Sequence, residues 1–138
     1  MTKEEYREVK EAAYILAANL SERNIGIEEY ENIINYEKSK YVDKDVSAIF
    51  EYTVKYPNDI DLIREIEENP KESKNISYLA KKLNWPFSVV PFKKMEIAKY
   101  DLANLINEDQ ELSRKAGRVS LSSYADQASF YEINGIKK

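Results

Sequence analysis

The chain of 138 residues contains no histidine and no cysteine. These absences exclude thiolate nucleophiles, histidine general bases, Ser-His-Asp triads, disulfides and zinc sites built from Cys or His. The three glycines, Gly26, Gly117 and Gly135, lie too far apart to form a glycine-rich phosphate loop. We therefore expect a protein that is not an enzyme and that uses neither a cofactor nor a metal ion.

Long hydrophobic runs are missing as well. The longest uncharged stretches, Ala12 to Ser21 and Leu83 to Phe92, have ten residues each, whereas a membrane span needs about 18 apolar residues or more. The N-terminal residues are rich in charge and do not have the apolar segment of a secretory signal. We expect a cytoplasmic protein that does not enter a membrane.

What the chain does contain is apolar residues spaced three and four positions apart along most of its length. This period is typical of amphipathic helices, and the scarcity of glycine disfavours a β-sandwich or barrel. The length is that of one domain, so we predict a single all-α domain over residues 1–138 with about six or seven helices. The predicted helices lie near residues 3–20, 27–40, 45–56, 59–69, 76–83 and 88–107, and the segments 109–116 and after Ser123 are further candidates.

Capping residues support several of these helix boundaries. Thr2 and Glu5 have the spacing of a capping box, and Asp45 and Asp59 are placed to cap the third and fourth helices. Gly117 is placed to end the helix that precedes it. Alternating apolar residues within 41–56 leave at most a short β-hairpin open as an alternative.

Charge divides the chain into two parts. Residues 1–72 hold 10 basic and 18 acidic side chains, whereas residues 73–138 hold 11 and 7. In the acidic part, Asp61, Glu65 and Glu68 share one face of a predicted helix. Such a face is a candidate binding site for a basic partner protein, because association is steered by the distribution of charge.

The basic part contains the most specific local pattern, Ile76 to Val90, which resembles a helix-turn-helix unit. Ala80 stands where the two helices would cross, and Trp85 is a candidate structural anchor of the turn. The pattern departs from the family at Asn84, where a glycine is usual, and at Pro91. If this pair, predicted over residues 76–107, contacts DNA, the candidate phosphate-binding residues are Lys81, Lys82, Lys93 and Lys94.

Two functions follow from these features. The first is a small non-enzymatic regulator or inhibitor that binds a larger protein, because the pI near 5.1 is low for a DNA-binding domain. In size and composition the chain is similar to phage or mobile-element inhibitors of nucleic-acid-processing machinery, of the anti-CRISPR or antirestriction type. The alternative is a helix-turn-helix transcriptional regulator with DNA as its partner. A homodimer stays open under both hypotheses.

Overall fold

The computed structural model describes residues 1–119, and every regular element within them is helical. No strand occurs in this range, and the all-α fold class is confirmed with a number of helices close to the expected one. The helix predicted after Ser123 lies outside the described residues. The elements are α1 (Lys3–Ser21), α2 (Ile27–Lys38), α3 (Lys44–Lys55), α4 (Asp59–Glu68), the 3-10 helix η1 (Glu72–Lys74), α5 (Ile76–Leu83), α6 (Val89–Tyr100) and α7 (Leu102–Glu108), followed by helical residues 110–119.

Of the three predicted N-terminal caps, Thr2 is confirmed, whereas Asp45 and Asp59 lie inside the helices that they were expected to cap. Thr2 Oγ1 accepts the backbone N–H of Glu5 at 3.1 Å and completes the capping box of α1. The cap of α3 is Asp43 and not Asp45, because the Asp43 carboxylate accepts the first free N–H groups of that helix. Asp59 is the first residue of α4, and its side chain points into the protein interior.

The long helix expected over residues 88–107 is divided at Asp101. This residue has φ 54° and ψ 48°, a left-handed conformation that ends α6 and begins α7 in a new direction. Aspartate is among the few residues with a side chain that adopt this conformation readily. Gly117 does not end a helix, since the helical residues continue through 119.

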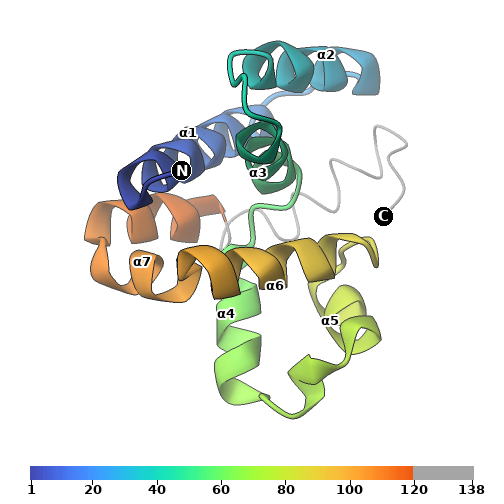
Figure 1. Cartoon of the computed structure of the whole chain (residues 1–138). Coiled ribbons are helices and arrows are strands. Elements are labelled where there is room, and N and C mark those ends of the chain that lie inside the picture. Colours follow the sequence, from blue (N-terminus) through green and yellow to red (C-terminus); the bar gives the residue numbers. More distant parts are fainter. Residues whose placement is uncertain (120–138) are drawn as a thin grey trace.

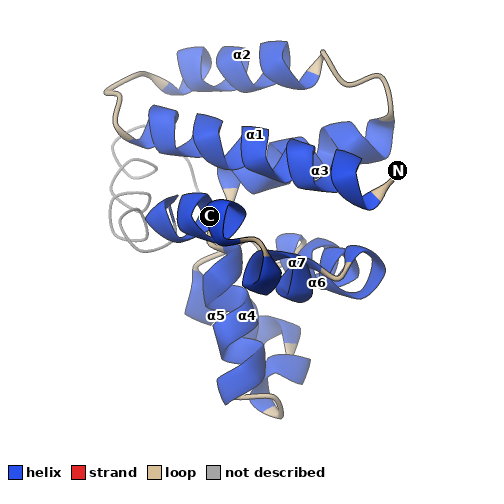
Figure 2. Ribbon diagram, turned by 90° about the vertical axis from the view of Figure 1, so that its left-hand side faces the viewer, coloured by secondary structure: helices blue, strands red, loops and turns tan. Residues whose placement is uncertain are grey.

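The buried apolar residues form two clusters. The first cluster joins α1, α2, α3, α7 and the helical residues 110–119, and it contains most of the core. It also includes Ile63 of α4, and Ile97 of α6 packs against both clusters. The second cluster joins α4, α5 and α6 through Leu62, Leu79, Leu83, Trp85, Val89 and Val90. Figures 1 and 2 place α2 at one end of the molecule and α5 at the opposite end, with α6 and α7 between them. The fold therefore brings α1 and α6 together where the two clusters adjoin.

Candidate interaction surface

The turn between α5 and α6 contains a left-handed residue at the position where a helix-turn-helix unit usually has glycine. Asn84 adopts the left-handed conformation (φ 59°, ψ 44°), which is usually supplied by glycine. The next residue, Trp85, donates its backbone N–H to the Ala80 oxygen at 2.9 Å and closes the end of α5. The two helices of the predicted pair are therefore present with a left-handed residue in the turn, and the second helix ends at Tyr100 because of the break at Asp101.

Trp85 lies in the second cluster with 4% of its surface exposed. Its indole Nε1 donates to Asn58 Oδ1 at 2.7 Å, and Asn58 Nδ2 donates to the Leu83 oxygen at 3.4 Å. The ring thus connects the turn to the residue that precedes α4. This contact gives the buried indole N–H the partner that it needs.

The middle of the outward face of α6 is apolar, with the exposed Ser88 before it and the exposed Lys99 at its end. Pro91, Met95 and Ala98 lie on this face and are exposed, and Phe87, in the preceding turn, exposes 58% of its surface. In a helix-turn-helix protein that reads DNA, bases are recognised mainly by Arg, Lys, Asn and Gln side chains. The four exposed apolar residues offer no hydrogen-bonding side chain at all.

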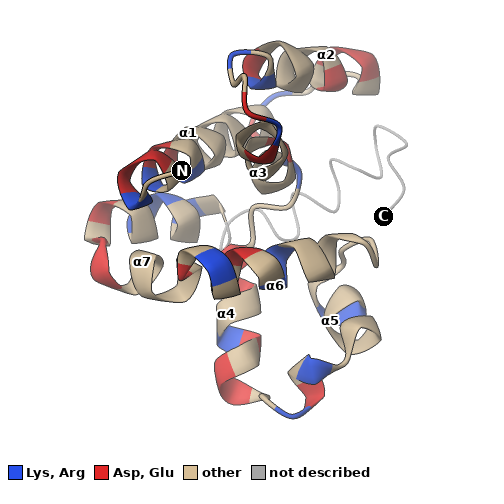
Figure 3. Cartoon of the chain, viewed as in Figure 1, with Lys and Arg blue, Asp and Glu red and all other residues tan. Residues whose placement is uncertain are grey.

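The exposed charged residues of α5 and α6 are lysines. Lys81, Lys82 and Lys99 are exposed, and the half-buried Lys94 donates from Nζ to the Ser73 backbone oxygen at 2.6 Å. The one acidic residue between Ile76 and Tyr100, Glu96, is fully buried. Figure 3 shows lysine positions on α5 and α6, and most of the acidic positions lie on other helices. We define the α5–α6 surface as the following residues: Lys81, Lys82, Phe87, Pro91, Lys94, Met95, Ala98 and Lys99.

The structure corrects the DNA-contact prediction for Lys93. This side chain is fully buried, and its Nζ forms an ion pair with Asp59 Oδ1 at 2.8 Å. Lys93 therefore turns toward the protein interior, where a reading helix usually packs an apolar residue, and it is not available to a phosphate. The other three predicted contacts, Lys81, Lys82 and Lys94, remain on the surface or at its edge.

Beneath α6 lies a buried ionic network that connects four helices. Lys10 of α1 contacts Thr53 Oγ1 at 2.8 Å, Asp59 Oδ2 at 2.9 Å and Glu96 Oε1 at 3.0 Å. Lys93 contacts the other oxygen of Asp59. The four charged side chains, two cationic and two anionic, are fully buried, so the network balances its formal charge internally.

Two tyrosines of α1 complete the network. The Tyr6 hydroxyl donates to Glu96 Oε1 at 2.6 Å, and the Tyr14 hydroxyl donates to Asp59 Oδ2 at 2.5 Å. Glu96 Oε2 is buried without a hydrogen-bond partner. One carboxylate oxygen of the network is thus left unsatisfied, although each of the other charged groups is bonded.

The pKa values in the network follow from burial and charge. Burial alone would raise the pKa of Asp59, but the ammonium groups of Lys10 and Lys93 outweigh it and lower that pKa to about 2. Burial lowers the pKa of Lys93, with Asp59 opposing the shift. The two carboxylates beside Lys10 overcome the effect of burial and raise its pKa. The interactions hold Asp59 in its charged form.

The network was missed by the sequence analysis, although the sequence contains a signal. Lys10 occupies the apolar stripe of α1, four residues after Tyr6 and four before Tyr14. A lysine within such a stripe must find an acidic partner, because an unpaired buried charge is very unfavourable. The periodicity could have indicated that a partner exists, but not that it would come from α4 and α6.

The acidic face predicted on α4 is not a single exposed surface. Glu65 is only 9% exposed and accepts hydrogen bonds from the Tyr78 hydroxyl at 2.8 Å and from Asn69 Nδ2 at 3.1 Å. Asp61 is half-buried and lies 3.5 Å from Arg64, and Glu68 is exposed. The three residues share a helical face by spacing, but that face meets α5 at Glu65 and leaves Glu68 near the end of α4.

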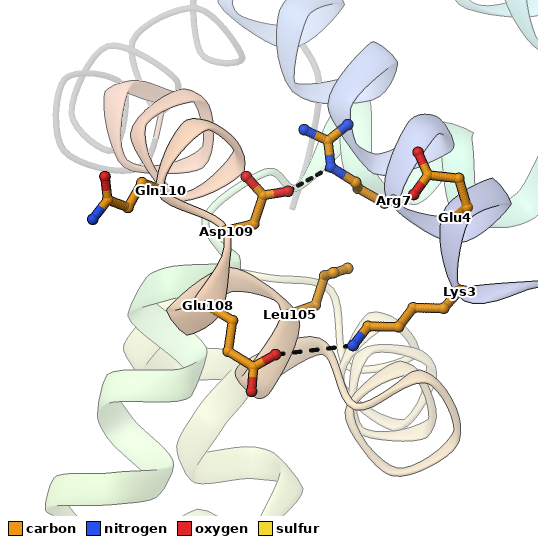
Figure 4. Close-up of a pocket in the computed structure, with 7 residues that line it drawn as sticks. All are labelled: Lys3, Glu4, Arg7, Leu105, Glu108, Asp109 and Gln110. Atoms are coloured by element: carbon orange, nitrogen blue, oxygen red, sulfur yellow. Dashed lines mark hydrogen bonds and ion pairs between the residues drawn. The ribbon is translucent and has the colours of Figure 1, made fainter.

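In the described part of the chain, one open pocket lies between α1 and α7 and another lies between α4 and α6. The larger, of about 570 Å³, is shown in Figure 4, and its cations are already paired, Arg7 with Asp109 and Lys3 with Glu108 at 3.9 Å. The smaller, of about 270 Å³, includes Lys94 and adjoins the α5–α6 surface. The smaller pocket therefore extends the candidate surface toward α4.

Comparison with other proteins does not indicate a function for this chain, so a function has to be argued from the structural features described above. Neither family models nor curated proteins nor solved structures match this chain. Within residues 1–119, no group of three or more acidic side chains is arranged to hold a metal ion, and no helix has the length and hydropathy of a membrane span. The α5–α6 surface is the feature from which a function can be argued.

Proposed function

We propose that the protein is a non-enzymatic regulator that acts by binding a larger protein through its α5–α6 surface. The observation that carries the proposal is the exposed apolar face formed by Phe87, Pro91 and Met95. Exposed apolar side chains that gather on one face, surrounded by polar residues, mark interaction sites on soluble proteins. Aromatic residues and methionine are also enriched in protein interfaces.

Charge indicates the chemistry of the partner. Because Glu96 is buried, the charged groups on the surface from Ile76 to Tyr100 are lysines. A complementary partner presents an apolar depression surrounded by Asp and Glu side chains. The hypothesis that this partner handles nucleic acid stays a prediction, and the surface favours an acidic region of such a protein over its basic nucleic-acid channel.

DNA binding is the second candidate, because Asn84 gives the turn the left-handed residue of a helix-turn-helix unit and Lys81 and Lys82 are exposed. Protein binding is favoured over it by two features of α6. Its outward face has apolar side chains at Pro91, Met95 and Ala98, where residues that read bases would be expected. In addition, Lys93 is paired with Asp59 inside the protein.

Site-specific photocrosslinking in the source cells tests the proposal. We would place p-benzoylphenylalanine at position 95, with a matched probe at position 42, where Val42 is 98% exposed on another part of the molecule. The proposal predicts one protein adduct from position 95 that the control does not give. The adduct should be lost with Phe87→Ser and with Lys99→Glu. If position 95 gives no specific protein adduct, the proposal is wrong.

A duplex-binding assay tests the alternative separately. A DNA-binding protein should bind duplex tightly, and its affinity should fall steeply between about 50 and 200 mM salt. Lys81→Glu combined with Lys82→Glu should then abolish binding. Our proposal predicts negligible duplex affinity for the unmodified protein, and tight binding at physiological salt would place the alternative first.

A further inference from the structure

We propose that Lys93 and Glu96 are positioning residues, which hold the α5–α6 surface in a fixed orientation on α1 through Lys10 and Asp59. The ionic network would thereby make the two apolar clusters unfold as one cooperative unit. This inference concerns how the surface is held, so it can be tested without a partner. The result of that test does not depend on whether the proposed function is correct.

The positions of these residues on α6 support the inference. Lys93 and Glu96 are three residues apart and share the buried face of the helix. Pro91 and Met95 are four residues apart and lie on the exposed face. A contact that fixes the first pair therefore also fixes the direction in which the second pair points.

The network fixes α6 from two sides. Glu96 is bonded to Tyr6 and Lys10 of α1, and Lys93 is bonded to Asp59 at the start of α4. Asp59 connects the two sides, because one of its oxygens contacts Lys93 and the other contacts Lys10. Charge-assisted hydrogen bonds are directional, whereas apolar burial is not, so the network adds a directional constraint on the rotation of α6 to the apolar contacts of Val89 and Val90.

Glu96 Oε2 accepts no hydrogen bond from another protein group, so this carboxylate is only partly satisfied within the network. A buried acceptor without a donor is unfavourable, and apolar residues of similar volume often replace buried ion pairs without loss of stability. Buried ionic contacts can instead define an orientation that apolar packing leaves less specific. Removing the charges should therefore loosen α6 even if the total stability is kept.

The division into two clusters makes such loosening measurable. Trp85 is the only tryptophan and lies in the second cluster, so its emission reports on α4, α5 and α6. Far-UV circular dichroism reports on all helices, most of which belong to the first cluster. Separation of the two signals during unfolding means that the clusters no longer unfold together.

The test variant is Tyr6→Phe/Lys10→Met/Glu96→Met. It removes the hydrogen bonds of the network between α1 and α6 and loses one charge of each sign, while the ring at position 6 can still stack on Tyr100, whose centroid lies 4.5 Å away. The control is Arg7→Met/Asp109→Asn, which breaks another ion pair of α1 without involving α6.

We expect urea unfolding of the unmodified protein and of the control to give coincident Trp85 and circular dichroism transitions. In the triple variant the Trp85 transition should occur at a lower urea concentration than the circular dichroism transition. Relative to the unmodified protein, native-state hydrogen exchange should accelerate at least tenfold more for α6 amides than for α1 amides. Coincident transitions with equal acceleration in both helices would overturn the proposal, as would separate transitions in the unmodified protein. If the triple variant does not fold, Glu96→Gln is judged by the same exchange measurement and the same criteria.

Discussion

Lys93 and Asp59 form an ion pair of 2.8 Å in which neither side chain is exposed to solvent. The pair links the buried face of α6 to the first residue of α4, and the Lys93 ammonium also lies 5.7 Å from the centre of the Trp85 ring. Lys93, which lies in a basic stretch of the sequence, therefore forms its ion pair inside the protein. The positive charge of the α5–α6 surface comes from Lys81, Lys82, Lys94 and Lys99.

Removal of this internal cation should destabilise the protein. We expect Lys93→Met to lower the free energy of unfolding by about 3 kcal/mol, because Asp59 loses one of its two counterions in a buried environment. Lys99→Met, at an exposed position of the same helix, should change it by less than about 0.5 kcal/mol. Urea denaturation measures both, and similar values for the two variants would contradict the burial of Lys93.

Acid should weaken the fold through Asp59. Its folded pKa of about 2 lies below the ordinary value of 3.8, so the folded state favours the charged form. The resulting stability, about 2 kcal/mol, is complete above the unfolded pKa and is lost as the pH falls from about 5 toward 2. Stability measured against pH should show a steeper loss in this window for the unmodified protein than for Asp59→Asn. Equal slopes would show that Asp59 is not held in its charged form.

Trp85 should be essential to the packing of the second cluster. Trp85→Ala should lower the free energy of unfolding by about 3 to 5 kcal/mol, since it removes a buried ring and leaves Asn58 Oδ1 without its donor. Phe87→Ala, two residues away and exposed, is the matched control. Thermal or urea unfolding followed by circular dichroism gives the comparison, and an unchanged midpoint for Trp85→Ala would show that the ring is not buried.

The acidic residues of α4 should differ from one another. Glu65→Lys should lower the free energy of unfolding by about 2 kcal/mol or more, because the carboxylate accepts the Tyr78 hydroxyl and is nearly buried. Glu68→Lys should have an effect within about 0.5 kcal/mol. Denaturation of the two single variants checks this difference. Equal tolerance would restore the interpretation of α4 as one solvated acidic face.

The turn between α5 and α6 should accept glycine and reject branched side chains. Asn84→Gly should keep or slightly raise the stability, because glycine adopts the left-handed conformation without a steric penalty. Asn84→Val should lower it by about 1 to 2 kcal/mol. Melting temperatures of the two variants test the conformation, and a Val variant as stable as the Gly variant would contradict it.

Local patterns in the sequence predicted the helices more accurately than their ends. The capping box at Thr2 and Glu5 depends on contacts within a few residues, so sequence spacing was sufficient to indicate it. Asn84 was interpreted as a departure from the helix-turn-helix pattern, although it adopts the left-handed conformation that glycine usually supplies. The break at Asp101 was missed because apolar residues continue across it. The direction of α7 is set by the first cluster, which buries Leu102.

The candidate surface was predictable only in part. The sequence indicated a helix-turn-helix-like pair with lysines, and Lys81 and Lys82 are exposed as that pattern implies. It could not separate Lys93 from Lys94, which are adjacent, because a rotation of 100° along the helix sends one inward and leaves the other at the edge. On α4, likewise, Glu65 is buried and Glu68 is exposed, a difference that the helical spacing did not indicate.

By itself the sequence determined the helical class, because helix formation depends on periodicity, caps and the scarcity of glycine, all of which are local. It also determined which chemistries are absent, since a chain without histidine or cysteine cannot build sites that need them. Only the tertiary structure decided which charges meet. Lys10, Asp59 and Glu96 are separated by 49 and 37 positions, and a buried ion is stable only where packing brings its partner within bonding distance.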